Sequence, residues 1–170
     1  MILVGDSLNM SFLGKDDTLS ATMDQMIYHT QAVCNGAKLP LIVFDMPFGT
    51  YLNAEQALLN TARVYSQTNA QAVKIEGGRE IASTVKALTS AGIAVVAHIG
   101  LMPQHVRADG GYSVKGKSEE EILSLIEDAK ALEEAGAFAM VLEGMKSEAA
   151  NRITADISIP TIGIGAGVGT

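Results

Sequence analysis

Charged side chains stand at the ends of several short apolar segments of this 170-residue sequence, where they could take part in chemistry. The clearest case is the segment 72–78 (AVKIEGG), which contains Lys74 and Glu76 and is ended by two glycines. If this segment is a β-strand, Lys74 and Glu76 share one face, because side chains alternate between the two faces of a strand. A lysine beside a carboxylate can be a structural ion pair or part of a reaction centre, and this segment alone favours neither interpretation.

Polar or charged residues end the other apolar segments in the same way. They are Asp6 with Ser7, then Asp45, His98 and Glu143. A buried charge is costly unless it is paired or bound to a metal, so a core built only for stability would not need these groups. In parallel sheets and barrels the carboxyl ends of the strands meet at one edge, where such folds place their chemistry. We therefore expect these side chains to converge in one pocket.

Three of the groups are carboxylates that could bind a divalent cation. Asp6, Asp45 and Glu76 could not all stay ionised close together without a positive charge between them. Oxygen ligands favour Mg²⁺ or a similar hard ion, and no cysteine cluster or His-Glu-x-x-His spacing indicates zinc. Glu143 would then lie outside the metal shell, where it could transfer a proton.

The elements that must position these groups alternate along the chain. Expected strands span residues 1–5, 39–44, 70–76, 93–97, 137–142 and 157–162. Helices are expected to start at the capping-box patterns Thr22–Gln25 and Ser118–Glu121, near Asn53, and at the cap Ser147. Apolar strands separated by helices indicate a parallel α/β sheet, which could be a doubly wound open sheet or part of an eight-stranded barrel. No linker interrupts the pattern, so we expect residues 1–170 to form one domain.

Two segments between these elements have their own patterns. The connection 99–117 is long for a compact domain, so it is expected to be a functional lid or a disordered segment. The segment 163–167 (GIGAG) does not continue into a Gly-x-Gly-x-x-Gly pattern. It therefore predicts a tight turn beside the pocket and not a dinucleotide site.

The composition excludes some classes of partner. The net charge is −7, the twelve basic residues are scattered, and tryptophan is absent, which argues against a nucleic-acid partner. No apolar run reaches the length of a membrane-spanning helix, and the first residues do not resemble a secretory signal. The only cysteine, Cys34, cannot form an internal disulfide, which fits a reducing compartment. We therefore expect a cytoplasmic protein without nucleic-acid or membrane partners.

The motifs as a group resemble the ketopantoate hydroxymethyltransferase family, and the resemblance runs colinearly along essentially the whole chain. The matching segments are VGDSL (4–8), DMPF (45–48), VKIEGG (73–78), AHIGLMPQ (97–104), GGY (110–112), VLE (141–143) and IGIGAG (162–167). The resemblance implies a (β/α)₈ TIM barrel related to phosphoenolpyruvate mutase and isocitrate lyase. Such barrels typically need about 250 residues. We therefore expect the first strand unit and the last one to be missing from this chain.

The same resemblance implies an activity and a role for each candidate residue. The reaction would move a hydroxymethyl group from methylenetetrahydrofolate to 3-methyl-2-oxobutanoate, giving 2-dehydropantoate through a Mg²⁺-stabilised enolate. The resemblance implies that Asp6, Asp45 and Glu76 bind Mg²⁺, with Asp45 and Glu76 acting partly through water. It also implies that Glu143 abstracts the proton and that the oxo acid is bound by Asp6, Ser7, Asp45, Lys74 and His98. The family is typically a decamer of dimerised pentamers, which implies a homo-oligomer.

Three alternatives stay open at this point. Lys74 could form a Schiff base, as in a class I-type aldolase. The chain could be a different metal-dependent lyase or aldolase acting on 2-oxo acids, because a fold does not fix its substrate. It could also be a folding fragment or assembly module that keeps the pocket but has no activity.

Overall fold

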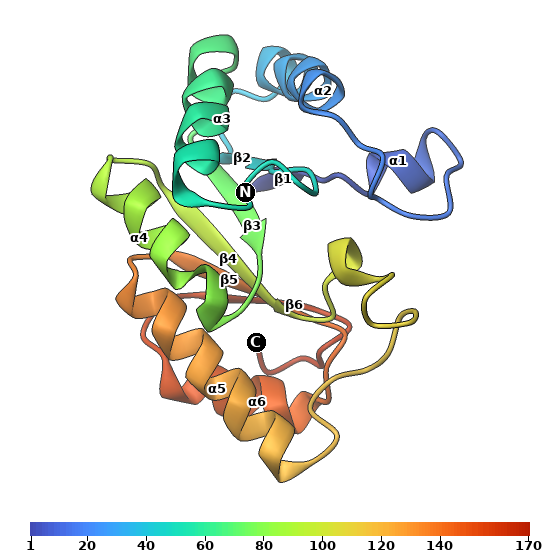
Figure 1. Cartoon of the computed structure of the whole chain (residues 1–170), viewed down its shortest axis with the longest axis vertical. Coiled ribbons are helices and arrows are strands. Elements are labelled where there is room, and N and C mark those ends of the chain that lie inside the picture. The colour runs from blue at the N-terminus through green and yellow to red at the C-terminus, as the bar shows by residue number, and fades with distance from the viewer.

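Six parallel strands form one curled sheet in which each strand pairs with its neighbours in sequence (Figure 1). The structure is a computed structural model that describes all 170 residues. The strands are β1 (Ile2–Val4), β2 (Ile42–Asp45), β3 (Ala72–Glu76), β4 (Val95–Gly100), β5 (Ala139–Glu143) and β6 (Thr161–Ile164). The order β1-β2-β3-β4-β5-β6 has no switch point, which is the arrangement of a barrel wall and not of a doubly wound sheet.

The longer helices follow the strands and cover the outside of the curled sheet, whereas the short α1 lies to one side of it (Figure 1). The α-helices are α1 (Leu8–Ser11), α2 (Met23–Gly36), α3 (Ala54–Gln67), α4 (Ala82–Ser90), α5 (Glu119–Glu134) and α6 (Ser147–Asp156). Two short 3₁₀ helices are η1 (Arg79–Ile81) and η2 (Pro103–His105). The helices α2, α3, α5 and α6 begin within one residue of the position that follows each predicted cap, and η2 lies within the long connection 99–117. None of the helices is long and apolar enough to cross a membrane.

The two faces of the sheet carry different apolar layers. The outer face and the helices share a large core that includes Phe44, Ile75 and Leu142. The inner face carries a separate small cluster, made of Val43, Ala72, Val96, Ala139 and Val141. Small side chains suit this inner layer, because a curled sheet brings its inward-facing residues close together.

Local capping explains where the helices begin. The Thr22 side chain accepts a hydrogen bond from the Gln25 backbone NH, and the Gln25 side-chain oxygen accepts one from the Thr22 backbone NH, so this predicted capping box is confirmed. The second predicted box is only half formed: Ser118 accepts from the Glu121 backbone, but the Glu121 carboxylate accepts from Lys117 instead. The predicted cap Ser147 was wrong by one residue, because Lys146 occupies the cap position of α6.

Strand starts are where the sequence pattern was least accurate. The predicted strand 39–44 begins only at Ile42, and Leu39 is 98% exposed. The predicted strand 157–162 becomes 161–164, because Ile157 ends α6 and packs in the outer core. An apolar residue before a strand can thus belong to the end of the preceding helix, and apolar content alone does not separate these two cases.

Candidate active site at the carboxyl ends of the strands

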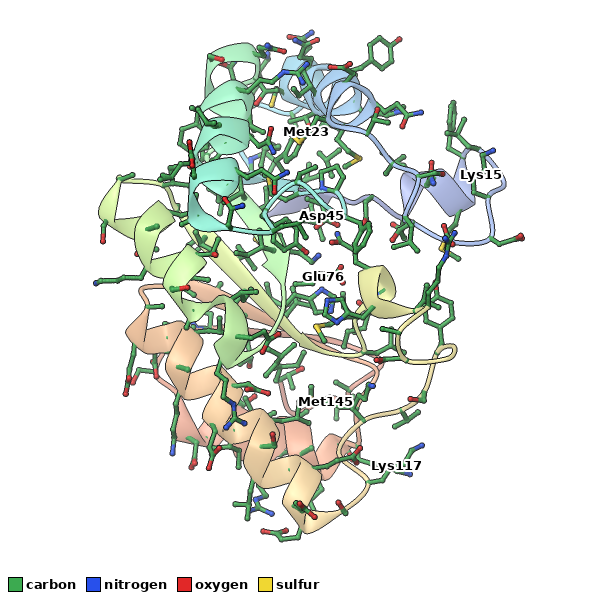
Figure 2. All side chains as sticks on the ribbon, in the orientation of Figure 1. Lys15, Met23, Asp45, Glu76, Lys117 and Met145 are labelled. Atoms are coloured by element: carbon green, nitrogen blue, oxygen red, sulfur yellow. The ribbon has the colours of Figure 1, made fainter.

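The charged residues lie on the inner face of the sheet, directly beyond its small apolar layer. Asp45 follows Val43 by two residues, and Lys74 follows Ala72 in the same way, so each pair shares the inner face. The register places Asp45 beside Lys74, and Glu76 beside His98, on neighbouring strands. Figure 2 shows the labelled Asp45 and Glu76 near each other in the middle of the molecule. The period of the strands therefore brings these groups together, as the sequence predicts.

Lys74 is the centre of this cluster. Its ammonium Nζ donates to Asp45 Oδ1 at 2.7 Å and to Glu76 Oε1 at 3.1 Å, and its side chain is only 2% exposed. Burial acts to lower the pKa of Lys74, but the two carboxylates outweigh it and raise the pKa well above its ordinary value. Lys74 is therefore held as a buried cation.

Glu76 is stabilised in its ionised form. Its Oε2 accepts from the backbone NH of Gln104 at 3.2 Å, and His98 Nδ1 lies 3.5 Å from its Oε1. Burial alone would raise the pKa of Glu76, but Lys74, His98 and the Gln104 NH together lower it to about 2. Glu76 thus supplies a permanent negative charge to the site.

Asp6 differs from its neighbours, because its charge is poorly compensated. Its backbone NH donates to Asp45 Oδ2 at 3.1 Å, while its own Oδ2 accepts from Gln104 Nε2 at 2.9 Å. Burial, and then the negative charge of Asp45, raise the pKa of Asp6 to about 7, although Lys74 and Gln104 oppose the shift. One ammonium does not neutralise Asp6, Asp45 and Glu76 together, so the site has room electrostatically for another cation.

Gln104 is the site residue that sequence reasoning missed. Its side-chain amide donates to Asp6 and to the Met46 carbonyl, both at 2.9 Å, and accepts from the Tyr51 hydroxyl at 2.5 Å. Together with its backbone bond to Glu76, these contacts tie η2 to the ends of β1, β2 and β3. Gln104 belongs to the segment 97–104, but it is a neutral residue on a long connection, so a pattern of charges at strand ends does not include it.

His98 connects the buried cluster to Glu143. Its Nε2 lies 3.0 Å from the Leu101 carbonyl, which can only accept, so Nε2 carries a proton there. The same nitrogen is 3.5 Å from Glu143 Oε2. Nδ1 is buried without a hydrogen-bond partner and faces Glu76. His98 therefore separates two carboxylates and contacts both.

Glu143 and Ser7 are the candidate residues that reach solvent. The Glu143 side chain is 24% exposed and makes no hydrogen bond, and burial is the main cause that raises its pKa above the ordinary value. Ser7 is exposed, and its hydroxyl is not used to cap α1. Both side chains thus keep their hydrogen-bonding capacity for a ligand.

The connection 99–117 crosses the end of the sheet next to these groups. Gly100 has φ +98°, and a Cβ there would lie 2.3 Å from the Glu143 carbonyl oxygen, so only glycine fits. Leu101 donates its backbone NH to that same carbonyl, and Lys115 forms an isolated bridge with Met145. The connection is therefore attached to β5 at both ends and carries Gln104 over the site.

No three His, Cys, Asp or Glu side chains are arranged to hold a metal ion by themselves. The Asp45 and Glu76 carboxylates are turned toward the Lys74 ammonium instead. The donor chemistry is nevertheless that of a hard cation, since every acidic ligand candidate offers oxygen.

Solved structures with the same fold confirm the predicted barrel type. Phosphonopyruvate hydrolase superposes with a TM-score of 0.71 at 15% identity, covering 95% of this chain and 58% of that one. The 2,3-dimethylmalate lyase, a member of the PEP mutase/isocitrate lyase superfamily, gives 0.59 at 20% identity, covering 92% and 56%. At such identities the likeness concerns the fold alone.

Sequence comparison identifies the family. Residues 1–170 match the family described as ketopantoate hydroxymethyltransferase. The 3-methyl-2-oxobutanoate hydroxymethyltransferase of Aliarcobacter butzleri (strain RM4018) is 63% identical over 170 residues, which are 100% of this chain and 63% of that protein. The enzyme of the same name from Sulfurimonas denitrificans is 60% identical over 98% of this chain and 64% of its own length. The chain thus spans slightly less than two thirds of these relatives, and it belongs to the ketopantoate hydroxymethyltransferase family.

Proposed function

We propose that this chain carries the active site for hydroxymethyl transfer from methylenetetrahydrofolate to 3-methyl-2-oxobutanoate, with 2-dehydropantoate as the product. The relatives that bear this activity in their names are 60–63% identical to it. The observation that carries the proposal is the buried Lys74 cation between Asp45 and Glu76, with Glu143 partly exposed on the next strand but one. This arrangement can hold an anionic 2-oxo acid and remove one of its protons.

We further propose that Asp6, Asp45 and Glu76 hold Mg²⁺, partly through water. Support comes from their oxygen donors, from the excess negative charge, and from the raised pKa of Asp6. Since the three carboxylates are not arranged around one point, water or substrate oxygens would complete the ligand set. When bound, Mg²⁺ would act as a Lewis acid that polarises the keto group of the substrate.

The substrate would be held by the remaining polar groups. The exposed Ser7 hydroxyl can donate to the substrate carboxylate, since it has no other partner. The Lys74 ammonium provides fixed positive charge near the keto oxygen, where negative charge develops when the C3 proton leaves. Asp45 and Glu76 keep that ammonium in place, and Asp45 also contacts Asp6 through its backbone NH.

Glu143 would act as the base. Its carboxylate takes the proton from C3, and the electron pair of the broken C–H bond moves toward the keto oxygen. Water hydrolyses the methylene bridge of the folate, which breaks its two C–N bonds, returns the nitrogens as N–H groups and leaves the one-carbon unit as an aldehyde. C3 then bonds to the aldehyde carbon, and the aldehyde oxygen, which came from water, takes up the proton held by Glu143 and becomes the hydroxyl of the product. The raised pKa of Glu143 suits it to this task, because a stronger base abstracts a proton more readily. His98 lies beside Glu143 and would orient it.

Deuterium exchange tests this assignment directly. Glu143→Gln should reduce exchange at C3 of 3-methyl-2-oxobutanoate in D₂O by at least about 100-fold, because the amide cannot accept the proton. Oxo-acid binding in the presence of Mg²⁺, measured by calorimetry, should be nearly unchanged. Glu148→Gln, an exposed glutamate on α6, is the matched control and should exchange normally. Undiminished exchange in Glu143→Gln would remove Glu143 from the base role.

The aldolase alternative is less well supported by the site. A Schiff-base lysine must attack as a neutral amine, whereas two carboxylates hold Lys74 as a cation. Borohydride reduction with substrate would trap a covalent adduct on Lys74 if this alternative were correct. Loss of exchange on chelation, without an adduct, would support the metal-dependent route. A metal-dependent lyase for another 2-oxo acid would catalyse deuterium exchange into its own substrate faster than into 3-methyl-2-oxobutanoate. An inactive module would catalyse no exchange.

We also propose a homo-oligomer in the cytoplasm, a decamer according to the family resemblance. Large apolar side chains stay exposed on this chain, among them Phe12, Tyr28 and Leu39, and such side chains are suited to subunit contacts. Cys34 is buried and unpaired, which fits a reducing compartment. Light scattering measures the mass of the assembly, and a monomer would contradict the first part.

A further inference from the structure

The ladder of hydrogen bonds between β2 and β3 stops one step before the strands reach the acidic site. Asp45 pairs with Lys74, and the Met46 backbone NH donates to the Lys74 carbonyl at 3.0 Å. In a regular parallel ladder the Glu76 NH would then donate to the Met46 carbonyl. Both groups have other partners instead, and Pro47, which has no NH, follows Met46. The ladder is therefore open at the point where Asp45 and Glu76 lie.

Two side chains bridge this opening. The Glu76 NH donates to the Tyr51 hydroxyl at 3.2 Å, and that hydroxyl lies 2.5 Å from Gln104 Oε1. A hydroxyl has one hydrogen, which goes to Gln104 because the Glu76 carbonyl is farther away, at 3.4 Å. Gln104 Nε2 in turn donates to the Met46 carbonyl at 2.9 Å. The bonds run in one direction from β3 to β2, so the hydroxyl and the amide replace the missing step of the ladder.

This direction fixes which end of the Gln104 amide faces Asp6. The Met46 carbonyl can only accept a hydrogen bond, so it requires the amide nitrogen on its side. The Tyr51 hydroxyl donates its hydrogen and therefore requires the amide oxygen. The second hydrogen of Nε2 then reaches Asp6 Oδ2 at 2.9 Å. A reversed amide would place its oxygen against the Asp6 carboxylate and the Met46 carbonyl, both of which are acceptors.

The bridge is shielded from water and anchored by packing. Tyr51, Gln104 and Asp6 are all buried, so a hydrogen bond lost among them leaves its partner unsatisfied. The Tyr51 ring belongs to the large outer core, together with Phe44 and Ile75. Close packing of the ring holds the hydroxyl in one place. Tyr51 thus connects the outer core to a carboxylate of the acidic site.

We propose that Tyr51 is a positioning residue that acts on Asp6 through Gln104, an inference that rests on the proposed function, in which Asp6 binds Mg²⁺ and the oxo acid. By orienting the amide, Tyr51 keeps Asp6 Oδ2 in a hydrogen bond and leaves Oδ1 for the ligand. Removing a group that orients a metal ligand in this way typically costs about 10–100-fold in affinity.

A double-mutant cycle tests whether Tyr51 acts through Gln104. Tyr51→Phe keeps the ring and removes the hydroxyl, and Gln104→Leu removes the amide. Calorimetry with 3-methyl-2-oxobutanoate and Mg²⁺ should give each single variant a dissociation constant about tenfold above that of the unmodified chain. The double variant should show the same loss, because Tyr51 has nothing to orient once the amide is gone. Independent effects would instead multiply to about 100-fold.

Tyr65 provides the matched control. Its hydroxyl also joins two backbone segments, because it accepts from the Ala94 NH at 3.4 Å and donates to the Gln71 carbonyl at 3.0 Å. Gln71 directly precedes β3, so these contacts lie at the opposite end of that strand from Glu76. Tyr65→Phe should leave the dissociation constant unchanged, whereas a structural role alone would make Tyr51→Phe and Tyr65→Phe alike in binding.

A crystal structure of Tyr51→Phe gives a second measurement that does not depend on Gln104→Leu. It should show the Gln104 amide displaced from Asp6, and an amide that keeps its place would contradict the proposal. Thermal unfolding midpoints report any loss of stability in each variant apart from its loss of binding.

Unchanged oxo-acid binding in Tyr51→Phe would overturn the inference, and so would losses that multiply in the double variant. An equal loss in Tyr65→Phe would also overturn it. Deuterium exchange at C3 by the unmodified chain tests the proposed function separately. Normal exchange and binding by the unmodified chain, together with unchanged binding in Tyr51→Phe, would refute only the present inference. An unmodified chain that neither binds the oxo acid nor exchanges its C3 proton would refute the proposed function, and this inference with it.

Discussion

Two groups of charges, one buried and one exposed, each contain a cation between two carboxylates, and the two cations, Lys74 and Arg79, lie five residues apart in the chain. In the first, Lys74 lies between Asp45 and Glu76, and all three side chains are almost fully buried. In the second, Arg79 of η1 lies between Glu127 and Asp128 of α5, and its side chain is 45% exposed. Each group has one cation and two carboxylates, but they differ in their contact with water.

This difference in exposure distinguishes a functional site from a structural contact between two elements. Arg79 also donates to the Ser124 carbonyl and hydroxyl, so the exposed group attaches the end of β3 to α5 and is satisfied by protein and water. The buried group carries a net negative charge with little water to solvate it, which is expensive in free energy. A cluster that is costly to the fold and lies at the carboxyl ends of strands is best explained by chemistry, whereas the exposed one needs only a structural explanation.

The largest effect is expected from removing the buried cation. Lys74→Met leaves the buried carboxylates of Asp45 and Glu76 without the cation between them and should lower the free energy of unfolding by about 3–5 kcal/mol. C3 exchange should be lost as well, because the positive charge near the keto oxygen is gone. Urea unfolding followed by circular dichroism measures the first effect.

A triple variant separates the structural effect from the chemical one. Asp45→Leu, Lys74→Met and Glu76→Leu together replace the whole charged group with apolar side chains. Such replacements are often neutral or stabilising, so stability should largely return while exchange stays absent. If Lys74→Met were as stable as the unmodified chain, the buried group would not differ in this respect from the exposed one.

The sequence predicted much of this arrangement because strands have a fixed period. Lys74 and Glu76 had to share a face once 72–76 was recognised as a strand, and the parallel order put Asp45 and His98 beside them. The helices were predictable from their caps and apolar stripes, as at Thr22. These features depend only on local periodicity and on the rule that parallel strands end at one edge.

Other features depend on contacts that no local pattern encodes. Gln104 reaches Asp6 from 98 residues away, on a connection whose path is fixed by Gly100 and by the pairing of Lys115 with Met145. The Asp45 and Glu76 carboxylates are oriented toward the Lys74 ammonium and not toward a common position for a metal ion, and this orientation also depends on tertiary contacts. The metal and substrate roles stay predictions until they are measured.

An intermediate effect is expected at Gln104, the neutral member of the buried region. Gln104→Leu is close in size but leaves Asp6, the Met46 carbonyl and the Tyr51 hydroxyl without this partner. The Tyr51 hydroxyl keeps its contacts with the Glu76 backbone, so two groups lose their partner. At about 1 kcal/mol for each lost hydrogen bond, the total loss should be about 2 kcal/mol, which is smaller than for Lys74→Met. Urea unfolding of Gln104→Leu beside Gln56→Leu measures the difference, because the Gln56 side chain bonds only to the backbone of Gly49 and Leu52 in the β2–α3 connection. Equal losses would show that Gln104 has no special role in holding the acidic site.

The smallest effect is expected at the exposed group. Arg79→Gln removes the ion pairs with Glu127 and Asp128, but the Glu127 carboxylate stays in water and the Asp128 carboxylate keeps its hydrogen bond from the backbone NH of residue 79. The change in unfolding free energy should be well below that of Lys74→Met, and it should shrink further when NaCl is raised to about 1 M, because salt screens exposed charges. The loss caused by Lys74→Met should hardly respond to salt, since ions do not reach the buried carboxylates. The unfolding free energies of both variants should therefore be measured at low and at high salt. If the loss caused by Lys74→Met also shrank in high salt, water and ions would already enter the acidic site. The two groups would then differ less than their exposure indicates.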